Sequence, residues 1–418
     1  MESESASVVE ERGVRFDTAG AFYRRGSIYG RDLAMLTLAM RAEEGKATRG
    51  GEAGEGAPEP ADVRVLDALA ASGGRAARYL RHGSAAFVCA NDGSAEACAL
   101  ARRNLEAAAP GGEGQRWRVA EGDGAAACHA ARARGEFFDL VDVDSFGSEG
   151  RFVGAALECV RRDGGLVYIT GTDGLAVGGH KPMRAWAAWG AALRPVPSAN
   201  EHGLRALIAH AVREAAARGL GATPLFSLYA PHGPVWRVML RVEKSASMSD
   251  ADVGFASHCP SCGQAGETRF ENLAAGFENK CRNCGATGGV LSGPMWLGPL
   301  HDPAHLREMH RRAAVRGWAS AEGNAEQRGL ARLLEAMEGE AAAGVARLAN
   351  AYRVTSLLKG RGLRRTPGVT ALVDALRDAG HAACGSHLSP EAIKTDADVN
   401  QIVELARRLT EPDEEQGR

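Results

Sequence analysis

Apolar, strand-like runs alternate with helical patterns along the first half of the chain, and this alternation constrains the fold most strongly. The runs are VRVLDAL, AAFVCAND, WRVAEGD, FFDLVDVD and GGLVYITGTD, and segments such as RAARYL and SAEACALARRNLEAA follow them. Short apolar runs of this kind predict buried strands, while the intervening periodicity predicts helices. Strands connected through helices form a parallel sheet covered by helices. The sequence therefore predicts an α/β fold.

Two later runs close the predicted sheet differently. TPLFSLYA and VWRVMLRVEK are separated only by the turn-like PHGP. Because a short turn joins neighbouring antiparallel strands, we expect these two runs to form a hairpin. A parallel sheet closed by such a hairpin is characteristic of the Rossmann-like class I methyltransferases, which use S-adenosylmethionine (SAM).

The chain of 418 residues is long enough for more than one compact unit. We expect an N-terminal element at 1–40 that contributes to the cofactor site, and a SAM-dependent methyltransferase domain at 63–245. Between them, residues 41–62 are rich in Gly, Glu, Ala and Pro without hydrophobic periodicity, which predicts a flexible insertion. Residues 246–418 are expected to form a zinc-containing, mainly helical C-terminal domain.

Composition narrows the class of protein. No run of eighteen apolar residues occurs, so no membrane span is expected. The acidic N-terminus MESESASVVEERG lacks the features of signal and transit peptides, which indicates an intracellular protein. The formal net charge is only −2, so any contact with nucleic acid must come from local basic patches.

The loop after the first strand has the composition of a cofactor loop. Asp67 ends the strand, and Ser72 and Gly73 precede a helix that opens near Arg75. Small residues let the backbone approach a ligand at the helix N-terminus, where a methionine carboxylate would fit. A tight turn without a ligand is the alternative. Neither G-x-x-x-x-G-K-[ST] nor G-x-G-x-x-G occurs, which favours an adenosyl sulfonium over ATP or NAD.

Two further acids end predicted strands at the same sheet edge. Asp92 follows Asp67 by 25 residues, a position where a carboxylate accepts both ribose hydroxyls. Asp123 ends the third run and is placed to meet the adenine amine. A strand-end Asp that only forms a turn is the alternative for Asp123.

The fourth run ends in Asp144, and Phe146 follows in the turn. Methylation of an exocyclic amine needs an acceptor on its N–H and an aromatic ring stacked on the base. Asp144 and Phe146 supply this pair as candidate catalytic residues. The alternative is an Asp that caps the turn, with Phe146 in the core.

Two C-x-x-C pairs lie beyond the predicted sheet. Cys259, Cys262, Cys281 and Cys284 have 18 residues between the pairs, which is the spacing of a four-cysteine zinc ribbon. Gly263 and Gly285 follow the pairs and allow the tight knuckle turns. Four thiolates leave no open coordination position, so the expected zinc is structural, and reduced cysteine without metal is the alternative.

A basic, acid-free segment, RVTSLLKGRGLRR, lies near the C-terminus. Its Lys359, Arg361, Arg364 and Arg365 are candidates for contact with an RNA backbone. A solvated surface loop is the alternative. Arg307, Arg311, Arg312 and Arg316 recur at helical spacing and form a second candidate cluster, or simply an exposed helix face.

Several motifs together give the chain a family resemblance. They are Ala21-Phe22-Tyr23, Gly30-Arg31-Asp32-Leu33, the stretch from Leu66 to Tyr79, Ala90-Asn91-Asp92, Asp142 to Ser148, Thr170 to Asp173, Glu201 with Gly203-Leu204-Arg205, Gly293 to Leu300, Ser386-His387 and Ile393 to Ala397. In this order, and over most of its length, the chain resembles the tRNA guanine-26 N2-dimethyltransferases.

The resemblance implies SAM as cofactor, tRNA as substrate and partner, and a tRNA-binding C-terminal domain. It implies cofactor contacts for Arg31, Arg75 and Asp92, an adenine contact for Asp123, and a target-guanine site at Asp144 and Phe146. The chain departs from the family pattern at Ser145, where the family has proline, and this variant resembles a divergent plant and algal branch described as chloroplastic. Because proline fixes φ, Ser145 bears on methylation efficiency, on mono- versus dimethylation and on the choice of guanine.

We therefore expect a SAM-dependent enzyme that methylates the N2 amine of a guanine in tRNA, at position 26, once or twice. One rival is a catalytically impaired RNA-binding protein that retains the methyltransferase fold. Another is an N2-guanine methyltransferase that acts elsewhere in RNA. No obligate protein partner is expected, and the nucleus, cytoplasm and chloroplast remain open as compartments.

Overall fold

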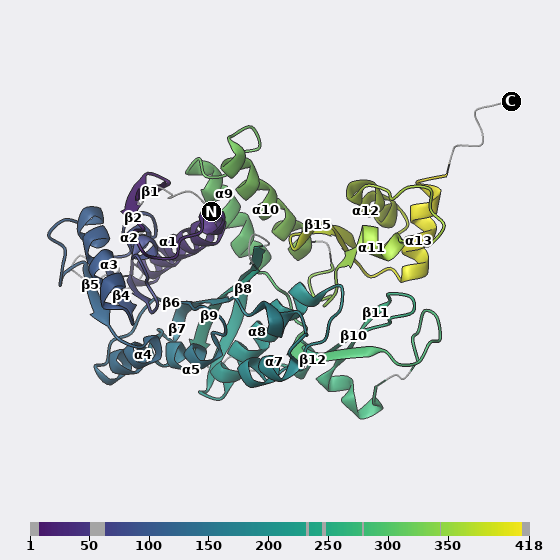
Figure 1. Cartoon of the computed structure of the whole chain (residues 1–418), viewed down its shortest axis with the longest axis horizontal. Coiled ribbons are helices and arrows are strands. Elements are labelled where there is room, and N and C mark those ends of the chain that lie inside the picture. The colour runs from purple at the N-terminus through teal and green to yellow at the C-terminus, as the bar shows by residue number, and fades with distance from the viewer. Residues whose placement is uncertain are drawn as a thin grey trace.

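The computed structural model describes residues 8–50, 63–230, 234–244, 248–277, 280–342 and 344–411. Its largest sheet has seven strands in the order β5-β4-β3-β6-β7-β9-β8 (Figure 1). They are β3 (Arg64–Asp67), β4 (Phe87–Asp92), β5 (Trp117–Glu121), β6 (Leu140–Asp144), β7 (Asp163–Gly171), β8 (Leu220–Ala230) and β9 (Val235–Lys244). β3 to β7 pair in parallel, and β9 is antiparallel to β7 and β8. The predicted parallel sheet and closing hairpin are confirmed.

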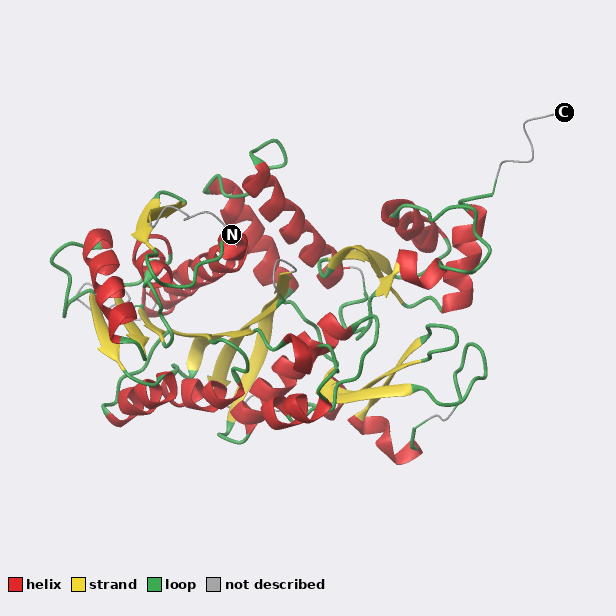
Figure 2. Cartoon of the chain, in the orientation of Figure 1, coloured by secondary structure: helices red, strands yellow, loops and turns green. Residues whose placement is uncertain are grey.

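Helices cover both faces of this sheet (Figure 2). They include α2 (Gly74–His82), α3 (Ala95–Ala108), α4 (Gly124–Ala133), α5 (Gly150–Cys159), α6 (Gly174–Val177), α7 (Pro182–Trp189) and α8 (Ala199–Ala216). Successive strand side chains point to opposite faces, so Val65 packs in the core beside α2, whereas Leu66 packs in the core beside α5 and α8. None of the described helices has the length and apolar character needed to cross a membrane.

The N-terminal segment packs tightly against the unit formed by the large sheet and its helices. β1 (Val8–Glu11) and β2 (Val14–Asp17) form a hairpin, and η1 (Arg25–Ser27) leads into α1 (Ile28–Gly50). Buried Glu11 of the hairpin pairs with Arg31 of α1 and with Arg78 of α2, the latter at 2.8 Å. These ion pairs fix the hairpin to two helices beside the sheet.

The expected flexible insertion at 41–62 is wrong for residues 41–50, because α1 continues to Gly50. This stretch is rich in Arg, Ala, Glu and Lys, which favour helix. Tertiary contacts also hold it: Glu43 pairs with Arg312 at 2.6 Å, and Glu44 pairs with Arg241 at 2.8 Å. Residues 51–62 of the expected insertion lie outside the described residues.

Packing does not follow the domain boundary expected at residue 246. α9 (Pro303–Val315) and α10 (Ala325–Ala342) pack with α1 above the large sheet (Figure 1). Their Leu306, Met309 and Leu334 share one core with Leu36 of α1 and Phe226 of β8. These helices therefore belong to the unit of the large sheet, because their apolar stripes are buried in its core.

Two smaller units follow the hairpin. The first contains η2 (Asp250–Asp252), β10 (Val253–His258), β11 (Ala265–Arg269), η3 (Phe270–Ala275) and β12 (Val290–Trp296), with the strands in the order β11-β10-β12. The second contains β13 (Tyr352–Arg353), α11 (Val354–Leu358), α12 (Val369–Asp378), β14 (Ala383–Ser386), β15 (Ser389–Thr395) and α13 (Val399–Arg408), and has its own core. The C-terminal helices are thus accompanied by two small sheets.

A buried ionic cluster anchors the last unit to the unit of the large sheet. Lys394 Nζ of β15 donates to Glu201 Oε1 of α8 at 2.6 Å, and the guanidinium of Arg205 donates to the same oxygen at 2.9 Å. A second carboxylate oxygen, on Glu340 of α10, lies 3.9 Å from Lys394 Nζ. All four side chains are buried, so their opposite charges compensate one another where water cannot.

Candidate active site

A cleft of about 610 Å³ opens at the carboxyl edge of the large sheet. β3 has β4 on one side and β6 on the other, so the chain leaves β3 and β6 in different directions at this edge. Open α/β sheets bind ligands at such a topological switch point. The cleft therefore lies where the fold favours a cofactor.

The structure brings six of the expected site residues into the lining of this cleft: Arg31, Ser72, Arg75, Asp92, Asp144 and Phe146. Three others lie elsewhere. Asp67 and Gly73 are buried next to the lining residues, and Asp123 lines a neighbouring pocket.

The loop between β3 and α2 is held in a tight, left-handed conformation. Ala71 and Gly73 have φ values of 47° and 72°. A Cβ atom on Gly73 would lie 2.8 Å from the Cβ of Ala101, so the close approach requires glycine. Asp92 accepts a backbone N–H from Ala71 at 2.8 Å and another from Ser94 at 3.0 Å. Asp92 therefore shapes the loop as well as lining the cleft.

Asp67 is buried at the end of β3 without a hydrogen-bond partner for either carboxylate oxygen among the described residues. It pairs in register with Asp142 on the neighbouring strand. Burial is the main cause that raises the pKa of Asp67, to about 8, and repulsion from Asp142 adds to it, while Arg75 opposes it. Asp67 is thus a neutral acid near pH 7.

Asp144 has the opposite electrostatic character, although it also ends a strand. Its Oδ2 accepts from Arg75 and, at 3.3 Å, from Arg237 Nη2. Burial would raise the pKa of Asp144, but the guanidiniums of Arg237 and Arg75 lower it to about 2. Both guanidiniums contact Oδ2, and Oδ1 has no hydrogen-bond partner among the described residues. An ionised acceptor with one free oxygen therefore borders the cleft.

Arg75 is the link between the two acids on this face of β6. Its Nη1 donates to both oxygens of Asp142 at 2.7 Å, and Tyr79 Oη donates to Asp142 Oδ2 at 2.7 Å. The pKa of Asp142 is raised, chiefly by burial and partly by Asp144, while Arg75 opposes the rise. Arg75 is thus held by Asp142 and in turn orients the carboxylate of Asp144.

Phe146 stands at the mouth of the cleft with 74% of its surface exposed, so the alternative of a core phenylalanine is wrong. The ring of Phe22, itself exposed, meets it edge to face at a centroid distance of 5.2 Å. An exposed aromatic pair beside a carboxylate acceptor suits a planar base.

Ser145 and the turn that follows it contact the end of β7. Its buried Oγ lies 3.4 Å from the carbonyl oxygen of Thr170 and donates to it. Gly147 N donates to Thr172 Oγ1 at 2.7 Å, and Thr172 N donates back to Gly147 O at 3.0 Å. Contacts with the end of β7 therefore hold the turn in place of a fixed proline φ.

Two lining residues were missed by the sequence analysis. Arg237 of β9 donates to Asp144 and, at 2.9 Å, to Thr170 Oγ1. It comes from the closing hairpin, and its only signal was a charged residue within an apolar strand. Phe22 was part of a family motif but had no assigned role. Arg237 is far in sequence from every expected site residue, whereas Phe22 lies nine residues before Arg31.

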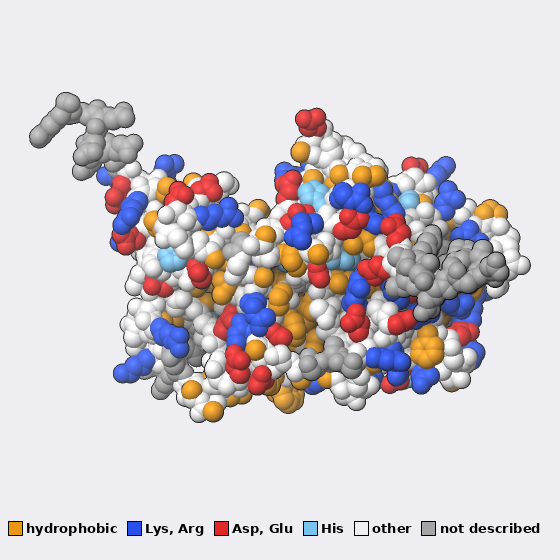
Figure 3. All heavy atoms as spheres, turned by 180° about the vertical axis from the view of Figure 1, so that it is seen from behind, with side chains coloured by type: hydrophobic (Ala, Val, Ile, Leu, Met, Phe, Trp, Pro, Cys, Tyr) orange, Lys and Arg blue, Asp and Glu red, His pale blue; other side chains and the backbone are white. Residues whose placement is uncertain are grey.

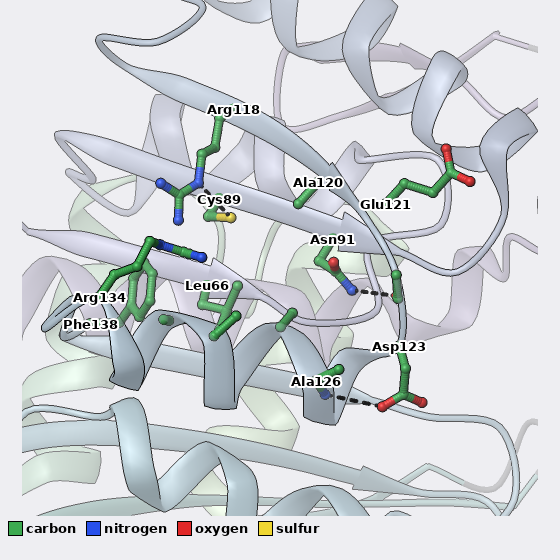
Figure 4. A pocket seen from close by; sticks show the side chains of 14 residues that line it. Leu66, Cys89, Asn91, Arg118, Ala120, Glu121, Asp123, Ala126, Arg134 and Phe138 are labelled. Carbon is green, nitrogen blue, oxygen red and sulfur yellow. Dashed lines mark hydrogen bonds between the residues drawn. The ribbon is translucent and has the colours of Figure 1, made fainter.

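Asp123 borders a separate pocket of about 290 Å³ between β4, β5 and α4 (Figure 4). It caps α4 by accepting two backbone N–H groups, and its Oδ2 pairs with Arg151 Nη2 at 2.7 Å. Figure 4 shows Asp123 at one end of this pocket, with Arg118 and Phe138 at the other. Because Arg151 lines the main cleft, this ion pair joins the two pockets.

The four expected metal ligands converge in the first small unit. The Sγ atoms of Cys259 and Cys284 are 3.7 Å apart, and those of Cys262 and Cys281 are 3.6 Å apart. Four sulfurs about 2.3 Å from a tetrahedral zinc ion lie about 3.8 Å from one another. Gly263 and Gly285 have φ values of 79° and 71°, as the knuckle turns require. The residues fit zinc.

A second group, His301, Glu340 and His387, also converges within the protein. His301 Nδ1 accepts the backbone N–H of Ser227 at 3.3 Å, so its proton resides on Nε2, the atom that faces Glu340. A protonated Nε2 cannot ligate a metal. We therefore assign this group to the buried ionic cluster.

The basic segment near the C-terminus is only partly available to a ligand. Lys359, Arg364 and Arg365 are exposed. Arg361 instead donates to the carbonyl oxygens of Cys262 and Leu357, both at 2.6 Å, and so ties the first cysteine pair to α11.

The second basic cluster is largely paired with acids. Arg311 and Arg312 both pair with Glu308, at 2.7 and 2.6 Å. Arg316 donates to the carbonyl oxygen of His82 at 2.9 Å. Figure 3 likewise shows Lys and Arg intermingled with Asp and Glu on the back face, without one continuous basic field. The exposed-helix alternative describes this cluster better.

Comparison with known proteins identifies close likenesses. A family model described as "N2,N2-dimethylguanosine tRNA methyltransferase" matches residues 3–407. A tRNA (guanine(26)-N(2))-dimethyltransferase of Aeropyrum pernix is 29% identical, over 93% of this chain and 89% of that protein. One of Methanopyrus kandleri is 30% identical, over 80% of this chain and 81% of that protein.

Among solved structures, a similar one is Trm1 from Pyrococcus horikoshii, in complex with S-adenosyl-L-methionine. Its TM-score is 0.75 at 23% identity, and the match covers 95% of this chain and 99% of that one. This likeness extends over all three units of the chain.

Proposed function

Because the chain belongs to the N2,N2-dimethylguanosine tRNA methyltransferase family, we propose that it transfers methyl groups from SAM to the N2 amine of guanine 26 in tRNA. The observation that carries the proposal is the ionised Asp144, with a free Oδ1, beside exposed Phe146 at the mouth of the cleft. The proposed product carries two methyl groups, because the related proteins are named dimethyltransferases.

The electrostatics of Asp144 define its role in methyl transfer. When bound, SAM supplies an electrophilic methyl group on a sulfonium, so the chain needs no nucleophile of its own. Asp144 Oδ1 accepts one N2–H and turns the nitrogen lone pair toward the cleft, while Phe146 stacks on the base. With a pKa of about 2, Asp144 is too weak a base to remove a proton from a neutral amine. It orients the amine. Methyl transfer would leave S-adenosylhomocysteine and a cationic N2, which would then release its proton to solvent.

The cofactor fits the residues of the cleft. The N-terminus of α2, with Ser72 and Gly73, would receive the methionine carboxylate, and Arg31 and Arg75 add positive charge there. Asp92 would accept the ribose hydroxyls. Asp67 is buried at the carboxyl end of β3, directly before the loop that would hold the cofactor. For Asp123 to meet the adenine amine, its ion pair with Arg151 must open.

The remaining assignments concern RNA and zinc. We propose that the exposed Lys359, Arg364 and Arg365 contact the tRNA backbone. Arg361 would support their loop by its hydrogen bond to the zinc knuckle. Zinc at the four cysteines is structural, since it would join the strands of the ribbon. The catalytic unit comprises residues 63–245 together with the N-terminal element, α9 and α10. The nucleus, cytosol and plastid stay open as the proposed compartments.

The test is mass spectrometry of nucleosides from unmodified tRNA incubated with the purified protein and SAM. We expect N2-methyl- and N2,N2-dimethylguanosine from the wild type, neither from Asp144→Ala, and neither from tRNA with adenine at position 26. Methylated guanosine from the tRNA with adenine at position 26 would show that the enzyme acts on another guanine. Tight tRNA binding without any methylated guanosine would refute the enzyme in favour of an RNA-binding protein.

A further inference from the structure

Helices α6 and α7, together with the chain to Ser198, present an apolar surface to solvent. Leu175, Met183 and Trp186 are 50%, 72% and 53% exposed. On α7 the opposite side packs inward through Ala185 and Trp189, which are buried. A helix that is apolar on its outer face as well as its inner one is typical of a binding surface.

The same surface carries positive charge. No Asp or Glu occurs from residue 174 to 200. His180, Lys181, Arg184 and Arg194 are exposed in this stretch. Arg184 Nε lies 3.4 Å from Oδ2 of Asp173, a buried acid directly before the stretch. Basic groups interleaved with an exposed indole and a thioether suit an anionic ligand with flat apolar faces.

This surface adjoins the mouth of the cleft. A Cβ on Gly174, the first residue of α6, would lie 3.3 Å from Pro234, which lines the cleft. At the other end, Trp189 Nε1 of α7 donates to Glu149, directly before α5. The chain after α7 then pairs with the zinc-binding unit through Ala192 and Gly293. The surface thus runs from the cleft toward the ribbon.

We propose that this α6–α7 surface binds the tRNA nucleotides that flank the target guanine, with Trp186 stacked on one unpaired base. The inference rests on the proposed function and extends it to a substrate contact outside the cleft. A guanine that reaches Asp144 must leave its stack, which unstacks its neighbours and exposes their faces. An indole offers a sequence-tolerant platform for such a base, while Lys181 and Arg184 meet the adjoining phosphates.

The positive charge of this surface favours RNA as its partner over a second copy of this chain, because two such basic surfaces would repel each other. The test compares Trp186→Ala and Trp186→Phe with the wild type in the full-length protein. Val315→Ala is the matched control, since Val315 is 76% exposed on α9 and apolar but far in sequence from this surface. Unmodified tRNA is titrated by fluorescence anisotropy, SAM by calorimetry, and oligomeric state is read by sedimentation velocity.

We expect Trp186→Ala to weaken tRNA binding about 5- to 150-fold, the range for loss of one base–aromatic stack. Trp186→Phe should recover most of that loss, and SAM affinity should not change. tRNA should also quench the fluorescence of the wild type more than that of Trp186→Phe. Lys181→Ala should weaken binding and lower its dependence on salt.

Unchanged tRNA affinity in Trp186→Ala would overturn the proposal while wild-type methylation still upholds the function. Loss of a wild-type dimer in Trp186→Ala, with tRNA affinity intact, would overturn it in favour of self-association. Absence of methylated guanosine with the wild type would instead refute the proposed function itself, whatever Trp186 does.

Discussion

Replacement of Asp144 by Asn preserves the shape of the side chain but changes one of its two hydrogen-bond acceptors into a donor. Arg75 and Arg237 point only donors at Oδ2, so the amide oxygen must take that position. The NH2 group then occupies the position of Oδ1, which faces the cleft. There it meets the N2 amine of guanine, which is also a donor. We therefore expect Asp144→Asn to be at least as impaired as Asp144→Ala.

The magnitude follows from two losses. A hydrogen bond to a charged acceptor contributes about 1.5–3 kcal/mol, and an unpaired donor at the same place costs about 1–3 kcal/mol. Together they amount to about 2.5–6 kcal/mol in the transition state, or about 10²- to 10⁴-fold in kcat/KM. SAM affinity should stay within a few-fold, because the substituted atom faces the substrate.

The assay is the initial rate of methyl transfer to tRNA for wild type, Asp144→Asn and Asp144→Ala from pH 5 to 9. Asp163→Asn serves as the control, since Asp163 lies at the opposite edge of the sheet, at the start of β7. Because the pKa of Asp144 is about 2, its protonation should produce no acid limb in this range. Activity of Asp144→Asn above a third of the wild-type value, or an acid limb that Asp144→Asn removes, would refute the reasoning.

Other predictions concern stability. The folded-state pKa of Asp67, about 8, exceeds its unfolded value of about 3.9, so the folded state holds the extra proton and stability falls by about 1.4 kcal/mol per pH unit between those values. Urea unfolding at pH 6, 7 and 8 should therefore show that the free energy of unfolding of Asp67→Asn rises relative to that of the wild type as the pH increases. Parallel pH profiles of the two proteins would contradict this. Lys394→Met should destabilise the protein by about 3–5 kcal/mol, because it removes one of the two cationic partners of the buried Glu201 carboxylate. The double variant Lys394→Met/Glu201→Gln should lose less than the sum of the single variants, whereas additivity would show that the two side chains do not interact. Elemental analysis should find one zinc per chain, lost in Cys281→Ser, and its chelation should weaken tRNA binding more than SAM binding, because Arg361 ties the knuckle to the basic loop. A metal-free wild type of equal stability would refute the zinc assignment.

Much of the site was readable from the sequence because it lies at the ends of strands. Apolar runs predicted each strand, and parallel strands place their carboxyl ends on one edge, so Asp92 and Asp144 were expected together. The knuckle cysteines were equally local, since each pair fits a single turn. These features depend on short-range periodicity and spacing, which one sequence records directly.

Tertiary structure alone decided how the acids behave and which distant residues join them. Asp67 and Asp144 both end strands, yet one is neutral and the other strongly ionised, because burial dominates at the first and two guanidiniums dominate at the second. One of those guanidiniums, on Arg237, arrives from the closing hairpin, and α9 and α10 return to the sheet from beyond the ribbon. Such long-range contacts leave no period or spacing in the sequence, so their electrostatic consequences become visible only in the folded chain.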